Sequence, residues 1–174
     1  MSATTPTGDP TGDPTVTPAS PGSSAGTGGP DGPDGTDRTT AALQTTLAAE
    51  HAAVFVYGAL GGQASQSRQP SLYARITRGY LAHRDRRDEL TALLTAAGVE
   101  PAPAEPGYAL PGDLGSARAI AARARGLEEQ AASTYAFLVA SSTGSTRAWA
   151  ADALVDAAVR GLGFGGRPED LPGL

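Results

Sequence analysis

The sequence predicts an all-α fold made of four helices. Four stretches space their apolar residues three and four apart, as on one face of an α-helix, and they cover about 38–61, 71–98, 116–142 and 145–161. Nothing in this region alternates apolar and polar residues with the period of two that a half-buried strand requires. A long proline-rich link between the second and third stretches indicates how the helices are connected.

Composition divides the chain at about residue 37. Residues 1–37 hold seven Pro, eight Gly and eight Thr but no Leu, Ile or aromatic residue. Such a segment cannot bury enough apolar surface to offset the entropy lost on ordering it. We therefore expect a disordered acidic extension at 1–37, a helical bundle at 38–162 and a Gly/Pro-rich tail at 163–174.

The balance of acidic and basic residues also changes at about residue 37. The extension carries five aspartates and no basic side chain, which accounts for the whole net charge of −5, whereas the remaining 13 arginines balance 13 acidic residues. A neutral bundle lacks the basic excess that nucleic-acid binding requires. The chain has no cysteine, so thiolate chemistry is excluded.

No membrane or secretory signal is visible in the sequence. The longest apolar stretch, Ala52 to Leu60, is about half of the roughly 20 residues that span a bilayer. The N-terminus has no basic segment followed by an apolar one, which a secretory signal needs. We expect a cytoplasmic protein with neither a nucleic-acid nor a membrane partner.

Short polar and glycine signals indicate where the helices begin and end. Asp37 or Thr39 is a candidate N-cap for the first helix, and Pro70 precedes the second. Gly98 suits the position after a helix C-terminus. Gly144 opens so short a connection that the last two helices are expected to be antiparallel neighbours.

The link over 99–115 decides the topology. It contains four prolines, so its 17 residues can reach roughly 50 Å in extended geometry. A helix of about 27 residues is roughly 40 Å long. The link can therefore travel the whole length of the bundle, which predicts a crossover between the second and third helices instead of a simple hairpin.

Glu50 interrupts an otherwise apolar helical seam, and this is the most informative feature for function. The seam consists of Leu43, Leu47, Glu50, Val54, Tyr57 and Gly61. A carboxylate at such a position is costly to bury unless it is paired, protonated or bound to a metal. His51 is turned about 100° away from Glu50, so we expect it to be partly exposed or hydrogen-bonded.

Comparable residues lie on the other helices. His83 lies on the seam of the second helix and Glu128 on that of the third. The fourth helix has two possible seams. One places Asp152 inside, whereas the other, which runs through Ala150 and Ala157, leaves Asp152 in solvent.

These residues allow two kinds of site. Glu50, His83 and Glu128, with Asp152 as a further candidate, could hold a single divalent metal ion. Alternatively, they form a buried polar network in which one glutamate pairs with Arg87, His83 or a tyrosine hydroxyl. No other cofactor is indicated.

Three segments resemble an uncharacterised bacterial ferritin-like family, a domain of unknown function. They are Leu47–Gly58, His83–Leu90 and Leu127–Glu129. The resemblance implies a ferritin-like four-helix bundle over about 40–162 and implies no particular activity.

Di-iron members of the wider ferritin-like group use one Glu from each of two helices and a Glu-x-x-His pair from each of the others. Tyr80 stands where the glutamate partner of His83 would be, and the fourth helix has neither Glu nor His. We therefore expect a structural or interaction module without a complete di-iron centre, which meets a second copy or another protein through its surface. The alternative is a metal-binding or oxidoreductase bundle with a reduced ligand set.

Overall fold

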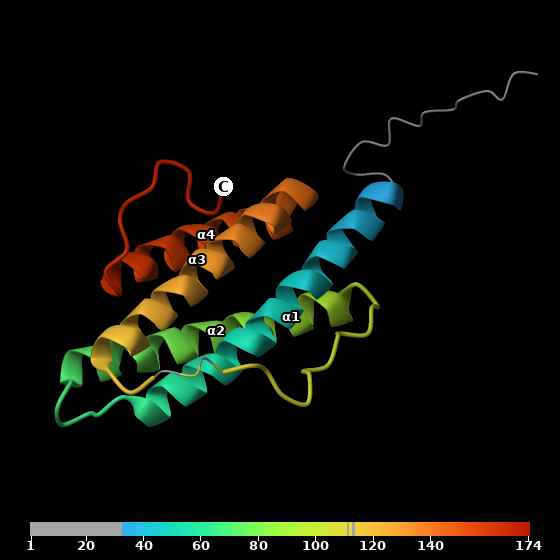
Figure 1. Ribbon diagram of the computed structural model, residues 1–174. Helices are drawn as coiled ribbons and strands as arrows, with labels where there is room; N and C mark the ends of the chain where they lie inside the picture. The colour runs from blue at the N-terminus through green and yellow to red at the C-terminus, as the bar shows by residue number, and fades with distance from the viewer. Residues whose placement is uncertain (1–32, 111, 113) are drawn as a thin grey trace, which may run out of the picture.

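The computed structural model describes residues 33–110, 112 and 114–174, and the greater part of the expected extension lies outside them. Four helices make up the fold, as predicted: α1 (Pro33–Gln63), α2 (Pro70–Ala96), α3 (Ala117–Ser141) and α4 (Gly144–Gly163) (Figure 1). The described residues contain no strand, so the fold is all-α. No helix in this part of the chain is long and apolar enough to cross a membrane, and the cytoplasmic location stays a prediction.

The start of α1 differs from the sequence-based expectation. The helix begins at Pro33, so residues 33–37 continue the helix and do not belong to an irregular extension. Proline is well suited to the first turn of a helix, and Asp34 in that turn interacts favourably with the helix dipole. Asp37 and Thr39 therefore lie inside the helix and are not its N-cap.

Glycine or serine residues mark three of the other helix ends. Gly98 after α2 has a φ of 73° and Gly144 at the start of α4 has a φ of 55°, which are values that glycine adopts without strain. The Ser116 side chain accepts a hydrogen bond from the backbone N–H of Ala119 at 3.1 Å and so caps α3. Gly163 is the last residue of α4, and Phe164 is its C-cap.

The link between α2 and α3 runs along α1 to the opposite end of the molecule (Figure 1). Near its start, the Gln44 side chain donates to Glu100 O at 2.6 Å and accepts from Ala102 N at 2.8 Å. Further along, the rings of Phe55 and Tyr108 lie 5.4 Å apart. The link thus crosses the bundle as its length predicts, and α3 runs in the same direction as α2.

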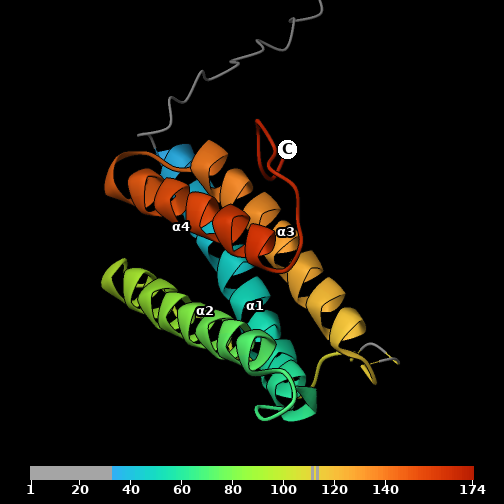
Figure 2. The same ribbon diagram turned by 90° about the vertical axis from the view of Figure 1, so that its left-hand side faces the viewer.

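The helices pack as two pairs, α1 with α2 and α3 with α4, which are joined by the contact of α1 with α3. Figure 2 shows α4 beside α3 and α2 beside α1. One apolar cluster surrounds Tyr57 and Ile76 near one end, and another surrounds Leu47 and Leu94. Glu50, in α1, lies in sequence between the members of the two clusters.

The buried faces resolve the alternatives that the sequence left open. On α2 the buried face passes through Gly79, His83 and Arg86. On α4 it passes through Ala150 and Ala157, whereas Asp152 is exposed. Of the two seams possible for this helix, the one that leaves Asp152 in solvent is therefore confirmed, and the one that places Asp152 inside is wrong. The small alanines allow α4 to pack closely on α3.

Candidate functional site

The structure brings Glu50, His83 and Glu128 together in the interior. Their exposed fractions are 2%, 0% and 0%. The Nδ1 atom of His83 lies 2.7 Å from Glu50 Oε2, and its Nε2 atom lies 3.4 Å from Glu128 Oε1. The imidazole is therefore placed between two carboxylates that come from α1 and α3.

Two buried tyrosines complete the hydrogen bonds to these carboxylates. The Tyr57 hydroxyl donates to Glu128 Oε1 at 2.5 Å, and the Tyr135 hydroxyl donates to Glu50 Oε1. Tyr57 also lies against His83, with ring centroids 5.1 Å apart. The sequence analysis named a tyrosine hydroxyl as a possible partner for one glutamate. In the structure each of the two glutamates accepts a hydrogen bond from a tyrosine.

A second layer of charges comes from α2 and α4. Arg160 donates through Nε to Glu128 Oε1 at 3.1 Å and through Nη1 to Asp156 at 2.5 Å. Arg86 donates to the same carboxylate of Asp156, and its guanidinium carbon lies 5.1 Å from the centre of the Tyr135 ring. The arginines therefore extend the network towards the surface between α2 and α4.

Sequence reasoning missed this second layer. It named Arg87, which instead pairs with the adjacent Asp88 at 2.6 Å on the surface. The i,i+4 spacing of Asp156 and Arg160 on one helix was the available signal. His51 behaves as expected, since it is half-buried and donates to the Ala102 carbonyl at 3.1 Å.

The pKa values of the two central groups move in opposite directions. Burial alone lowers the pKa of His83, but the hydrogen bonds and charges of Glu128 and Glu50 outweigh burial and raise it above 6.5. Burial alone raises the pKa of Glu128, but the hydrogen bond and charge of His83, together with Arg160, lower it below 4.5. Both shifts favour an imidazolium between carboxylates.

The formal charges of the network then cancel. Three carboxylates face three cations when His83 is protonated: Glu50, Glu128 and Asp156 against His83, Arg86 and Arg160. Charge compensation of this kind is what allows ionised groups to remain in an apolar interior.

The tyrosines stay neutral in this environment. Burial and the neighbouring carboxylates raise the pKa of Tyr57 and of Tyr135 far above the ordinary value of 10. Each phenol is therefore a hydrogen-bond donor at neutral pH, and it does not supply a phenolate as a base or a ligand.

Glycine allows the close packing around Tyr57. A Cβ atom at residue 79 would lie 2.5–2.9 Å from three atoms of the Tyr57 side chain. Gly79 therefore lets α2 approach α1 closely enough for the Tyr57 ring to pack over it, next to His83. The side chain of Glu128 packs similarly against α4, where a Cβ at Gly161 would be 3.6 Å from Glu128 Cβ.

Some polar atoms at the site have no hydrogen-bond partner. They are Glu128 Oε2, Arg86 Nη1 and Arg160 Nη2, and all three are buried. Within residues 33–110, 112 and 114–174, no group of three or more His, Asp or Glu side chains is arranged to hold a metal ion. The arrangement can hold a proton on His83 and can tie the helices together.

Comparison with known proteins relates the chain to a solved structure and to a protein family. A crystal structure of a conserved hypothetical protein from Mycobacterium tuberculosis is similar to it, with a TM-score of 0.68 and 30% sequence identity, and the match covers 74% of this chain and 96% of that one. No curated protein matches the chain. Residues 42–174 match the family described as "Domain of unknown function (DUF4439)", and the chain therefore belongs to this family.

Proposed function

We propose that this chain is a ferritin-like bundle that lacks a complete di-iron centre and acts as a structural or interaction module. One observation carries the proposal. Both ring nitrogens of His83 face carboxylate oxygens, at 2.7 Å and 3.4 Å. A histidine that holds a metal must offer one ring nitrogen without its proton, and the raised pKa of His83 opposes this.

The residues on α4 fit a dinuclear metal centre poorly. A Glu-x-x-His pair would be needed there, and α4 instead contributes Arg160, whose Nε lies 3.1 Å from Glu128 Oε1. A guanidinium at this distance repels a divalent cation that approaches the same oxygen. The chain thus supplies its own cations where metal ions would otherwise balance the carboxylates.

The network supports a structural role because it lies between two apolar clusters and joins all four helices. Each polar side chain of the network has at least one partner on another helix, so a shifted helix would leave a buried charge without compensation. The network then fixes the register of the helices. Partners, whether a second copy or another protein, would meet the outer surface.

A second candidate function is the binding of a single metal ion by Glu50, His83 and Glu128. It is favoured by one observation, which is that Glu128 Oε2 is buried without a hydrogen-bond partner. A carboxylate oxygen in this state is available to a cation. Binding would require His83 to lose a proton, so metal affinity would rise with pH.

Elemental analysis separates the two functions. Protein purified without chelator should contain far less than one Fe, Mn or Zn per chain, and its melting temperature should not change on addition of these ions. An ion present at a hundred times its dissociation constant would stabilise the fold by about 2.7 kcal/mol. One ion per chain in the native protein, lost in His83→Ala but kept in His51→Ala, would establish the metal site.

A spectroscopic experiment tests the network directly. The chain has only two histidines, so His51→Gln leaves His83 as the single source of imidazole signals. Nitrogen-15 labelling across pH 5–9 should show that both ring nitrogens of His83 stay protonated to a higher pH than those of a histidine in an unfolded peptide. A His83 ring that loses its proton at a lower pH than the peptide would contradict the proposal.

A further inference from the structure

A pocket of about 220 Å³ reaches Glu50 from the surface of the bundle, between α1, α3 and residues 108–109 of the crossing link. Its lining includes Gln130, which is exposed, and Glu50, which is only 2% exposed. The space exists because both helices carry small side chains here, namely Ala49, Ala52, Ala53 and Ala131. The pocket therefore connects solvent with one carboxylate of the central network that Glu50, His83 and Glu128 form with their partners.

Tyr108 is the aromatic wall that the crossing link contributes to this pocket. Its ring lies 5.4 Å from the ring of Phe55, and its hydroxyl accepts a hydrogen bond from the backbone N–H of Glu105 at 3.0 Å. Residues 105 and 108 both lie outside the helices, and such connecting segments move more readily than the elements they join. The ring can therefore move aside without the unfolding of a helix.

The pocket offers polar partners for water. Arg123 lines it, and the Nε atom of this side chain is buried without a hydrogen-bond partner in the protein. The carboxylate of Glu50 accepts hydrogen bonds from His83 and Tyr135, and a carboxylate has about four acceptor positions. A cavity holds water when it has such partners and about 30 Å³ for each molecule. This pocket therefore has room for several water molecules and groups that bind them.

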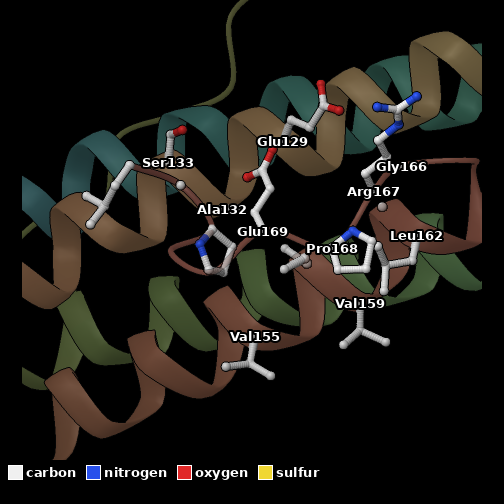
Figure 3. A pocket seen from close by; sticks show the side chains of 16 residues that line it. Glu129, Ala132, Ser133, Val155, Val159, Leu162, Gly166, Arg167, Pro168 and Glu169 are labelled. Carbon is white, nitrogen blue, oxygen red and sulfur yellow. The ribbon is translucent and has the colours of Figure 1, made fainter.

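Other sides of the network offer no comparable route to solvent. A larger cavity of about 460 Å³ lies between α3, α4 and residues 166–174 (Figure 3), and no residue of the central network lines it. Towards the exposed carboxylate of Asp156, the neighbour of Glu128 is Arg160, which donates to both residues. A guanidinium keeps its protons at neutral pH and so does not relay them. Exchange with solvent is therefore expected at Glu50.

We infer that the pocket beside Glu50 is a water-filled passage through which the hydrogens of the central network exchange with solvent, and that the Tyr108 ring limits its width. The hydrogen on His83 Nδ1 passes to Glu50 Oε2 across 2.7 Å, and the Glu50 carboxyl group then gives it to water in the pocket. Water returns a hydrogen by the same two steps, so neither residue has changed its charge at the end. The inference needs only the position of Glu50 in the lining and does not rest on the function proposed above.

Hydrogen exchange of the His83 ring tests the inference. NMR of nitrogen-15-labelled His51→Gln protein observes His83 alone, because the chain has only two histidines. Exchange through the passage should be independent of urea far below the unfolding midpoint, since no helix has to unfold. An exchange rate that rises with urea as steeply as global unfolding does would overturn the inference.

Two matched pairs of variants locate the passage. Tyr108→Ala should accelerate exchange about tenfold, the factor by which loss of one aromatic contact shifts an opening equilibrium, whereas Tyr108→Phe keeps the ring and should leave the rate unchanged. Ala52→Leu should slow exchange severalfold, because the larger side chain excludes water from the passage. Ala158→Leu makes the same change at a half-buried alanine of the larger cavity and should not slow it. Equal rates within either pair would contradict the passage.

Ala49→Leu provides an independent repeat, since Ala49 is also half-buried and lines the pocket. Circular dichroism melting of each variant confirms that the fold is intact. The protonation of His83 across pH 5–9 tests the proposed function of the network, whereas these exchange rates test the passage. Each of the two can therefore fail while the other holds.

Discussion

His83 donates through Nδ1 to Glu50 at 2.7 Å, and this bond ties α2 to α1 inside the bundle. The two residues are 33 positions apart in sequence, and both are almost fully buried. A buried pair of this kind destabilises the fold strongly when only one partner is removed, because the other charge then stays in the interior without compensation.

Replacement of His83 by alanine should therefore lower the free energy of unfolding by about 3–5 kcal/mol. Two buried carboxylates would lose their shared cation, and a cavity would remain. Urea unfolding monitored by circular dichroism measures the change. His51→Ala is the control, since that ring makes one hydrogen bond at the surface, and its loss should cost about 1 kcal/mol. Similar losses in both variants would show that the central network contributes little.

Stability should fall as pH rises above about 6.5. The pKa of His83 is raised in the folded protein, so between the unfolded value of about 6.5 and the folded value the native state holds one more proton. The free energy of unfolding then decreases with pH, by at most about 1.4 kcal/mol per unit. This contribution is complete below about pH 6.5 and is lost as pH rises through the folded pKa.

Glu128 changes the stability with pH in the opposite direction to His83, because its pKa is lowered below 4.5 in the folded state. Its contribution is complete above about pH 4.5 and is lost as pH falls through the folded pKa. Urea unfolding across pH 3–9 should therefore show the greatest stability from these two groups between about pH 4.5 and 6.5. His83→Gln should remove the alkaline decrease and His51→Gln should keep it. A decrease that survives in His83→Gln would assign it to another group.

Gly79→Ala should be destabilising although it lies in the middle of a helix. The new methyl group would fall 2.5 Å from the Tyr57 ring, and overpacking of this kind costs about 1–3 kcal/mol. Gly126→Ala is the matched control on α3, where nothing lies within 4 Å of the added Cβ. That change should stabilise by about 0.5–1 kcal/mol. Thermal melting of both variants separates the effect of packing from that of helix propensity. If both substitutions shifted the melting temperature in the same direction, the close contact at Gly79 would be refuted.

Gln44→Ala should loosen the link that crosses the bundle. The side chain holds the backbone at Glu100 and Ala102 through two hydrogen bonds, so we expect a loss of about 1–2 kcal/mol. Hydrogen exchange at the Ala102 amide should accelerate, because its acceptor is removed. Thr45→Ala, at a residue whose hydroxyl bonds only within α1, should leave this amide protected. Unchanged exchange in Gln44→Ala would mean that the link is held by other contacts.

Much of the fold could be predicted from the sequence because the features that indicate it involve residues close together in the chain. The helical periodicity on α2, the glycine after it and the length of the proline-rich link each depend on neighbouring residues. The start of α1 at Pro33 could not be found in this way. The composition of residues 33–37 resembles that of the preceding segment, and only the continuation of the helix distinguishes them.

The candidate site could also be predicted only in part. The seam positions of Glu50, His83 and Glu128 on three helices were enough to predict that these side chains meet in the interior. Arg86 and Arg160 were not named as partners because arginine side chains are mostly exposed in folded proteins, and only the packing of α2 and α4 around Asp156 draws these two inward. The metal assignment stays a prediction that elemental analysis decides.

The distribution of charge between the two helical pairs has a consequence for assembly. The pair α1–α2 brings one buried carboxylate and two cations, Glu50 against His83 and Arg86. The pair α3–α4 brings two carboxylates and one cation, Glu128 and Asp156 against Arg160. Each pair alone would carry an excess of one sign on the face that it turns to the other pair, where His83 meets Glu128 and Arg86 meets Asp156, and two copies of the same pair would repel each other. Fragments cut within the crossing link should consequently recombine as complementary partners and not as homodimers.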